Sequence, residues 1–297
     1  NQKNQKNQKN QKDQKDEKNQ MEKMSQSEYM TLREMDIQSV IDAGYPAYPH
    51  KFTPDANQYN TDTKQYKYRS MKISDFNSMY NNMIVPGEHL DQINVSMMGR
   101  VHFIRKSSKK LIFIDLHQEN TKVQIMMNCG LYLNGLDHFN LMASVIRIGD
   151  IIGVAGIPGK TKTGELSLIP HQIQVLSWCK YMLPPRTRFD EDGNVVSGLI
   201  NQEIRYRQRY LDLIINETNF DTFIKRSKII KSIRNFLDND LHLFETETPV
   251  LNMNVGGAIA KPFESYSNDY KSPLFLRIAP ELFLKTLIIG GFRGVYE

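Results

Sequence analysis

Between residues 93 and 180 the chain is built from short stretches in which apolar and polar side chains alternate. A period of two is typical of strands that have one buried face. The predicted elements, in order, are strands over 95–104, 111–116 and 122–127, a helix over 131–139, and strands over 150–157 and 165–176. A small β-barrel is therefore expected in this part of the chain.

Three strands, a helix and two strands is the element order of the OB-fold, a five-stranded barrel whose faces and loops bind oligonucleotides. The last two strands are separated by PGKTKTGE, a turn rich in glycine and lysine. The pattern therefore predicts an OB-fold over residues 93–180.

Longer helical periodicities lie on both sides of this module. Apolar residues recur at helical spacing over 27–43, and Gly44 is a natural end for that helix. A second helix is expected over 222–237, where an apolar stripe lies opposite lysine and arginine side chains. The strand FETETP follows and closes at Pro249, since proline is tolerated only at the edge or end of a strand. The fold class expected is α+β with an all-β module.

Composition then divides the chain. The expected parts are a Lys/Asn/Gln-rich tail (1–26), an N-terminal helical region (27–92), the OB-fold (93–180), a linker rich in Pro, Arg and Gly (181–202) and a further α+β domain (203–297). The tail repeats NQK and has no apolar residue before Met21, so it cannot bury a core and should be disordered in isolation. A low-complexity leader without a role remains an alternative for it.

Positive charge is concentrated rather than spread. The formal net charge is +5, yet residues 98–126 alone carry six Lys/Arg against two acids, and residues 1–23 carry seven lysines against four acids. A basic patch on a small module is the electrostatic footprint of a nucleic-acid partner. Solvated faces with ordinary lysine content are the alternative.

Several other classes of protein are disfavoured. The two cysteines, Cys129 and Cys179, form no Cys-x-x-Cys pair, which argues against a disulfide scaffold or a thiolate metal site and suits a reducing cytosol. No metal-binding residues are expected. No apolar run approaches the roughly 18 residues that a membrane-spanning helix needs. A cytoplasmic protein without a membrane partner is expected.

Specific motifs occupy the last hundred residues. RYRQRYLDL spans 205–213, the diglycine loop NVGGAIAKPF lies at 254–263, and RIAPEL lies at 277–282. In this order and spacing they resemble a class II lysyl-tRNA synthetase of subclass IIb and eukaryotic type, and the resemblance runs from about residue 48 to 297. It implies a lysine–tRNA ligase that makes lysyl-adenylate from lysine and ATP with Mg²⁺ and transfers lysine to tRNA(Lys). It also implies that residues 203–297 begin a catalytic domain built on an antiparallel sheet.

The resemblance assigns roles within the OB-fold. Phe113, Gln124 and Glu165 match the aromatic, Gln and Glu that hold the central uridine of the anticodon in this family. Their chemistry suits the task, since an aromatic ring can stack on a base and the two polar groups can hydrogen-bond its edge. From the residues alone, burial of Phe113 in the core is the stronger alternative.

The resemblance also assigns an amino-acid site and an interface. Gly257 and Glu281 match the residues that hold the α-amino group of lysine, and Glu297 matches a family Glu on the nucleotide side. The helix over 222–237 and the strand ending at Pro249 resemble motif 1, which forms the homodimer interface. A helix and strand packed within one chain's core would show the same pattern.

The phosphate-handling residues of the family have no match in these 297 residues. The arginines of motifs 2 and 3 would follow residue 297, so no catalytic residue is assigned and the segment alone is expected to be inactive in adenylation. A non-catalytic anticodon-binding protein and an aspartyl or asparaginyl relative remain alternatives to the lysine enzyme.

Overall fold

The computed structural model describes most of the chain. The described residues are 24–52, 54, 59–60, 65–66, 68–185, 188–189, 195–254 and 256–297. The predicted tail lies outside this set except for its last three residues. The chain divides into two compact units at Glu217, and each unit is described by itself.

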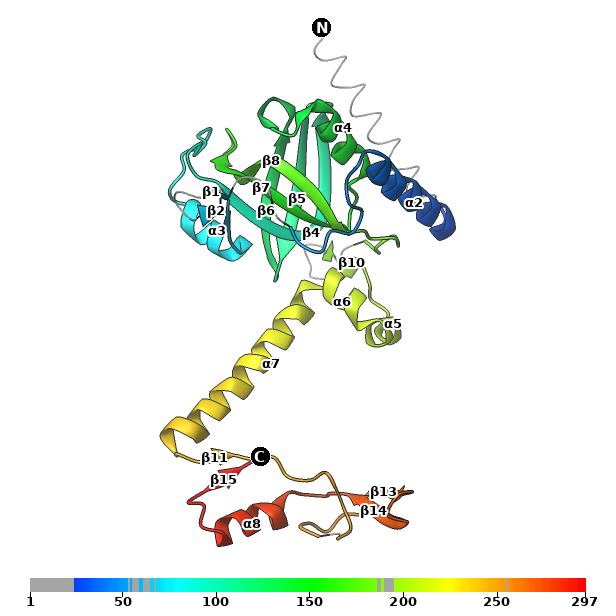
Figure 1. Ribbon diagram of the computed structural model, residues 1–297, viewed down its shortest axis with the longest axis vertical. Helices are drawn as coiled ribbons and strands as arrows, with labels where there is room; N and C mark the ends of the chain where they lie inside the picture. Colours follow the sequence, from blue (N-terminus) through cyan, green and yellow to red (C-terminus); the bar gives the residue numbers. More distant parts are fainter. Residues whose placement is uncertain are drawn as a thin grey trace. The chain divides into compact units, whose positions relative to one another are not determined.

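A five-stranded barrel forms the centre of the first unit (Figure 1). Its strands are β4 (Val95–Ser108), β5 (Leu111–Gln118), β6 (Thr121–Asn128), β7 (Ile151–Lys160) and β8 (Leu166–Ser177). The strand order is β4-β5-β6-β8-β7, and β7 pairs back onto β4 to close the sheet. Only β6 and β8 run parallel within the barrel. This is the OB-fold connectivity predicted from the alternating pattern.

Shorter elements surround the barrel. The helices are α2 (Gln26–Asp42), α3 (Ile73–Tyr80), a 3₁₀ turn at Cys129–Leu131, α4 (Gly135–Val145), α5 (Gln202–Arg207) and α6 (Arg209–Ile215). The small strands are β1 (Tyr59–Asn60), β2 (Gln65–Tyr66), β3 (Arg69–Ser70), β9 (Arg188–Phe189) and β10 (Val195–Ser197). The helix predicted over 131–139 begins later, at Gly135, because the 3₁₀ turn takes up the first apolar position.

Alternation along the strands sorts side chains into a core and an outer face. Fully buried residues such as Leu116, Ile125 and Ile152 fill the barrel. Burial of apolar surface is worth about 25 cal/mol per Å², so this interior is the main source of the unit's stability. The β5–β6 hairpin closes through Glu119 and Asn120, which both have positive φ (46° and 63°). Two such residues are typical of the type I′ turn, whose twist suits a tight hairpin.

Helix α2 is attached to the barrel by a buried ionic network. A capping box at Ser25 and Glu28 begins the helix. Five residues after Glu28, Arg33 has no exposed surface and donates to both oxygens of Asp150 at 2.7 and 2.8 Å. Its guanidinium also lies 5.0 Å from the ring centroid of Trp178. The helix predicted over 27–43 is therefore confirmed, and it belongs to the same unit as the OB-fold.

The second unit contains one long helix and two small sheets. Its elements are α7 (Glu217–Asn235), a π-helical turn (Phe236–Asp240), β11 (Phe244–Glu245), β12 (Leu251–Asn252), β13 (Glu264–Ser267), β14 (Ser272–Leu276), α8 (Glu281–Ile289) and β15 (Val295–Tyr296). β12, β14 and β13 form an antiparallel sheet, and β11 pairs parallel with β15. The predicted strand FETETP is extended only at β11, so Pro249 lies in the connection to β12.

Candidate functional site

The outer face of β4, β5 and β6 carries two of the three predicted anticodon residues. Phe113 lies on β5 between Arg105 of β4 and Met126 of β6, its register partners on the two sides. Its neighbours Ile112 and Ile114 are buried in the barrel, so the strand's alternation turns Phe113 outward. The alternative that Phe113 belongs to the core does not fit this geometry.

Arg105 lies close to the ring of Phe113. Its guanidinium carbon is 4.8 Å from the ring centroid, a cation–π distance. The contact keeps a positive charge beside an aromatic face, which is the combination that single-stranded nucleic-acid sites use for backbone and base. Lys109 and Lys110, both exposed, extend the positive charge into the β4–β5 turn.

Gln124 and Glu165 are brought together by a residue that the sequence interpretation missed. Gln124 of β6 is the register partner of Ser167 on β8. The hydroxyl of Ser167, a fully buried residue, lies 3.0 Å from Oε1 of Gln124 and 3.2 Å from the backbone oxygen of Glu165. With the amide oxygen engaged, Nε2 of Gln124 is left to donate to a ligand. No sequence signal pointed to Ser167, because a serine in a strand is common.

Glu165 is positioned by a tight turn. Thr161 and Glu165 exchange two hydrogen bonds, from Thr161 N to the Glu165 carbonyl and from Glu165 N to Thr161 Oγ1, both 3.0 Å. Gly164 allows the turn with a φ of +89°. The side chain of Glu165 is exposed, and within residues 68–185 its carboxylate forms no ion pair. A fixed backbone therefore presents an available hydrogen-bond acceptor.

In the second unit, the two residues predicted to hold an amino group lie side by side. Gly257 has a φ of +91°, a conformation that L-residues with side chains rarely adopt. A Cβ at this position would lie 3.4 Å from the Cβ of Glu281. The diglycine loop thus reaches the first turn of α8, where a carboxylate is favoured by the helix dipole. The sequence placed these residues 24 positions apart, and the structure brings them into contact.

The carboxylate of Glu281 holds an ammonium group in this structure. Nζ of Lys285, one helical turn later, lies 2.6 Å from Oε1 of Glu281. Both side chains remain largely exposed, so this ion pair is weak and exchangeable. A free amino group of a ligand can replace Lys285 with the same chemistry.

Glu297, which the resemblance matches to a Glu on the nucleotide side, is held by Arg277 and Thr248 in this structure. Arg277 and Glu297 form an ion pair at 2.7 Å, and Thr248 Oγ1 donates to the same carboxylate at 2.7 Å. Arg277 also contacts the Thr248 hydroxyl. Hydrogen bonds from Arg277 and Thr248 lower the pKa of the Glu297 carboxyl to about 2. This cluster ties three segments of the second unit together.

Pro249, the predicted interface residue, is exposed. The apolar stripe of α7 is exposed as well. The exposed members within α7 are Phe223 (51%), Ile224 (42%), Ile230 (38%) and Ile233 (54%). Within the described residues this helix therefore does not pack into a core, and its apolar stripe is left open for a partner surface.

The motif RYRQRYLDL folds as two short helices, α5 and α6. Arg205 and Arg209 converge on Asp212, at 2.9 and 2.6 Å, and Asn216 donates to it at 2.7 Å. Burial opposes ionisation of Asp212, but the hydrogen bonds from Asn216 and Arg205 outweigh it and lower the pKa of this carboxyl. A salt-bridged helical segment, one interpretation of the motif, is what the structure contains.

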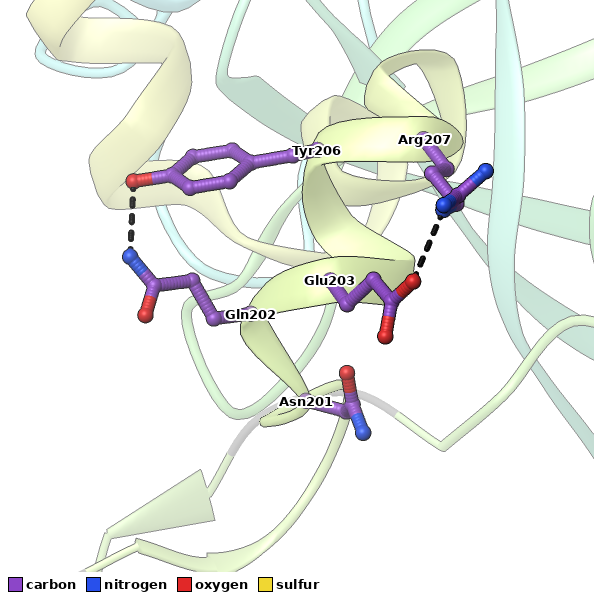
Figure 2. A pocket seen from close by; sticks show the side chains of 5 residues that line it. All are labelled: Asn201, Gln202, Glu203, Tyr206 and Arg207. Carbon is purple, nitrogen blue, oxygen red and sulfur yellow. Dashed lines mark hydrogen bonds and ion pairs between the residues drawn. The ribbon is translucent and has the colours of Figure 1, made fainter.

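A shallow, open pocket lies on α5 (Figure 2). Its lining residues are Asn201, Gln202, Glu203, Tyr206 and Arg207. The side chains are paired with each other, Gln202 with Tyr206 at 3.0 Å and Arg207 with Glu203 at 2.9 Å (Figure 2). It contains no convergent set of catalytic groups.

The described residues contain no cluster of three or more His, Cys, Asp or Glu side chains able to hold a metal ion. In the same residues no helix has the length and apolar character needed to cross a membrane.

Two protein-family models match this chain, one over the barrel and one over the segment that follows it. Residues 95–176 match the family model described as "OB-fold nucleic acid binding domain". Residues 201–297 match the model described as "tRNA synthetases class II (D, K and N)". The first match covers the barrel, and the second begins just before the RYRQRYLDL motif.

Curated relatives narrow the family. The chain is 36% identical over 281 residues to a lysine–tRNA ligase of Cladosporium cladosporioides, covering 92% of this chain and 42% of the relative. It is 37% identical to a probable cytoplasmic lysine–tRNA ligase of Enterocytozoon bieneusi (92% and 47%) and 38% identical to a lysine–tRNA ligase of Methanospirillum hungatei (88% and 45%). The chain thus spans less than half the length of these relatives. By its two domains and its relatives, the chain belongs to the lysine–tRNA ligase family of class II aminoacyl-tRNA synthetases.

Proposed function

We propose that this protein is a cytoplasmic lysine–tRNA ligase, which activates lysine with ATP and transfers it to tRNA(Lys). The observation that carries the proposal is the outer face of the OB-fold that bears Phe113, Gln124 and Glu165, which we call the anticodon face. On it an outward aromatic (Phe113), an amide donor (Gln124) and an exposed carboxylate (Glu165) come from β5, β6 and the turn before β8. Family membership supports the reaction, and the relatives, all named as lysine–tRNA ligases, favour lysine over aspartate or asparagine as the amino acid.

Uridine is the base that this face fits best. A uridine edge presents an N–H donor beside carbonyl acceptors. Glu165 can accept from the N–H, Nε2 of Gln124 can donate to a carbonyl, and Phe113 can stack on the ring. Arg105, beside Phe113, supplies positive charge for the adjoining phosphate.

Lysine is held, in this proposal, by Gly257 and Glu281. The missing Cβ of Gly257 lets the ligand approach the backbone, and the Glu281 carboxylate pairs with the α-ammonium group in place of Lys285. ATP would supply the adenylyl group, which is transferred to the lysine carboxylate as pyrophosphate leaves, and Mg²⁺ would be the metal of this reaction. Residues 1–297 hold the amino group and the anticodon, and we propose that alone they do not form adenylate.

A homodimer is part of the proposal. The exposed apolar stripe of α7 and the exposed Pro249 form a surface of the kind that obligate interfaces bury. The negatively charged tRNA is the other macromolecular partner, and no membrane partner is proposed.

The experiment is a binding comparison between anticodon stem–loops. The chain is titrated against a tRNA(Lys) stem–loop with the anticodon UUU and against the same hairpin with cytidine at the central position, at one fixed salt concentration. The wild-type chain should prefer UUU by roughly 10-fold or more, because cytidine lacks the N–H that Glu165 accepts. Glu165→Ala should abolish the preference, and Phe113→Ala should weaken both hairpins.

Lys180→Ala, an exchange of a charged residue outside the three contact positions, serves as the matched control and should preserve the preference. Equal affinity of the wild-type chain for the two hairpins would contradict the proposal.

A further inference from the structure

A second aromatic ring stands on the outer face of β4. Phe103 is 52% exposed, which is unusual for a phenylalanine within a barrel strand. Its neighbour Ile104 packs against the core, so Phe103 itself points away from the barrel. Nothing in the function assigned to Phe113, Gln124 and Glu165 uses this ring.

The register places Phe103 one row away from Phe113. Phe103 pairs with Asp115, and Arg105 pairs with Phe113, so the two rings occupy successive outward rows of the β4–β5 ladder. Outward residues two apart on a strand are separated by about 6–7 Å. Two unstacked bases of one loop can therefore reach the two rings together.

Asp115 determines which part of a nucleotide can meet Phe103. It lies directly opposite Phe103 and beside Gln124 of β6. Within residues 68–185 its carboxylate makes no ion pair, so it repels phosphate and accepts hydrogen bonds from base N–H groups. The phosphate backbone is instead attracted towards Arg105 and the lysines of the β4–β5 turn. This division of charge directs a base, rather than the backbone, to the ring of Phe103.

We propose that Phe103 is a second base-stacking position on the anticodon face, occupied by a nucleotide adjacent to the one held at Phe113. This rests on the proposed function and extends it, because a second stacked base gives the protein contact with a neighbouring anticodon position. Asp115 accepts a hydrogen bond from the edge of that second base.

The test uses Phe103→Ala in the whole 297-residue chain, with the UUU stem–loop of tRNA(Lys) as the probe. Affinity should fall about 5- to 100-fold, which corresponds to the usual loss on removing one base–aromatic stack. Phe103→Tyr should retain affinity because its ring still stacks. The slope of affinity against salt should not change, since no charge is removed.

Met98→Ala is the matched control. Met98 is an exposed apolar residue (43%) on the same strand, but it pairs with Gly153 of β7 rather than with β5. Its removal should leave RNA affinity unchanged. Unaltered thermal unfolding of each variant shows that the barrel remains folded.

An abasic replacement in the hairpin locates the partner nucleotide. Phe103→Ala should have no further effect on a hairpin that lacks the base stacked on Phe103. Phe113→Ala should lose its effect only on a hairpin that lacks the central base. If Phe113→Ala weakens binding and Phe103→Ala does not, the second position is overturned and the proposed function stands. If neither variant weakens binding, both fail. Loss of self-association with unchanged RNA affinity would identify Phe103 as a protein contact and contradict the proposal.

Discussion

At the scale of single residues, the anticodon face depends on how each strand divides its side chains between core and solvent. The alternation around Phe113 could be read from the sequence, but a phenylalanine in a strand is more often buried. In the structure Ile112 and Ile114 are buried in the barrel, so Phe113 lies on the outer face. Ser167 could not be found in advance, because its role comes from a pairing between β6 and β8 that joins residues 43 positions apart.

Ser167 is predicted to be a positioning residue for Gln124. Ser167→Ala removes the hydroxyl that engages the amide oxygen, and a neutral hydrogen bond of this kind is worth about 0.5–1.5 kcal/mol. Affinity for the UUU stem–loop should fall by roughly 2- to 10-fold, as measured by fluorescence anisotropy.

A double-mutant cycle separates this role from a general loss of structure. In a Gln124→Ala background, Ser167→Ala should cost nothing further. An equal loss in both backgrounds would show that Ser167 does not act through Gln124.

At the scale of elements, periodicity predicted the five barrel strands and the helices over 27–43 and 222–237. It did not predict how α2 is attached. The sequence pattern did not single out Arg33, which is fully buried against Asp150 and Trp178. The strand was expected to continue to Pro249. It is shorter in the structure, where β11 pairs with β15 over only two residues.

Loss of Arg33 should destabilise the first unit strongly. Arg33→Met keeps much of the side-chain volume but leaves the buried Asp150 without its bidentate partner. Breaking a buried ion pair from one side costs about 3–5 kcal/mol. Chemical denaturation should show a fall of this size in the free energy of unfolding.

Arg207→Met is the matched control for the Arg33 variant. Arg207 forms an exposed ion pair with Glu203, and such pairs contribute about 0–1 kcal/mol. A similar small change for Arg33→Met would mean that the network does not hold α2 to the barrel.

At the scale of the whole molecule, the chain joins an OB-fold barrel to a segment that matches the class II tRNA synthetases. The order of the motifs could be recognised from sequence, and the contact between Gly257 and Glu281 follows from the fold of the second unit. The apolar pattern alone could not predict that the stripe of α7 is exposed, because a helix buried in its own core and a helix at an interface have the same pattern.

Competition between whole tRNAs tests the central claim most directly. The tRNAs for lysine, aspartate and asparagine share a central uridine in the anticodon, so the contacts proposed at Phe113, Gln124 and Glu165 do not by themselves distinguish the three tRNAs. With labelled tRNA(Lys) bound to the chain, unlabelled tRNA(Lys) should compete at least about fivefold better than either of the other two, a difference of about 1 kcal/mol. Equal competition by the three tRNAs, or stronger competition by tRNA(Asp) or tRNA(Asn), would contradict the assignment to lysine.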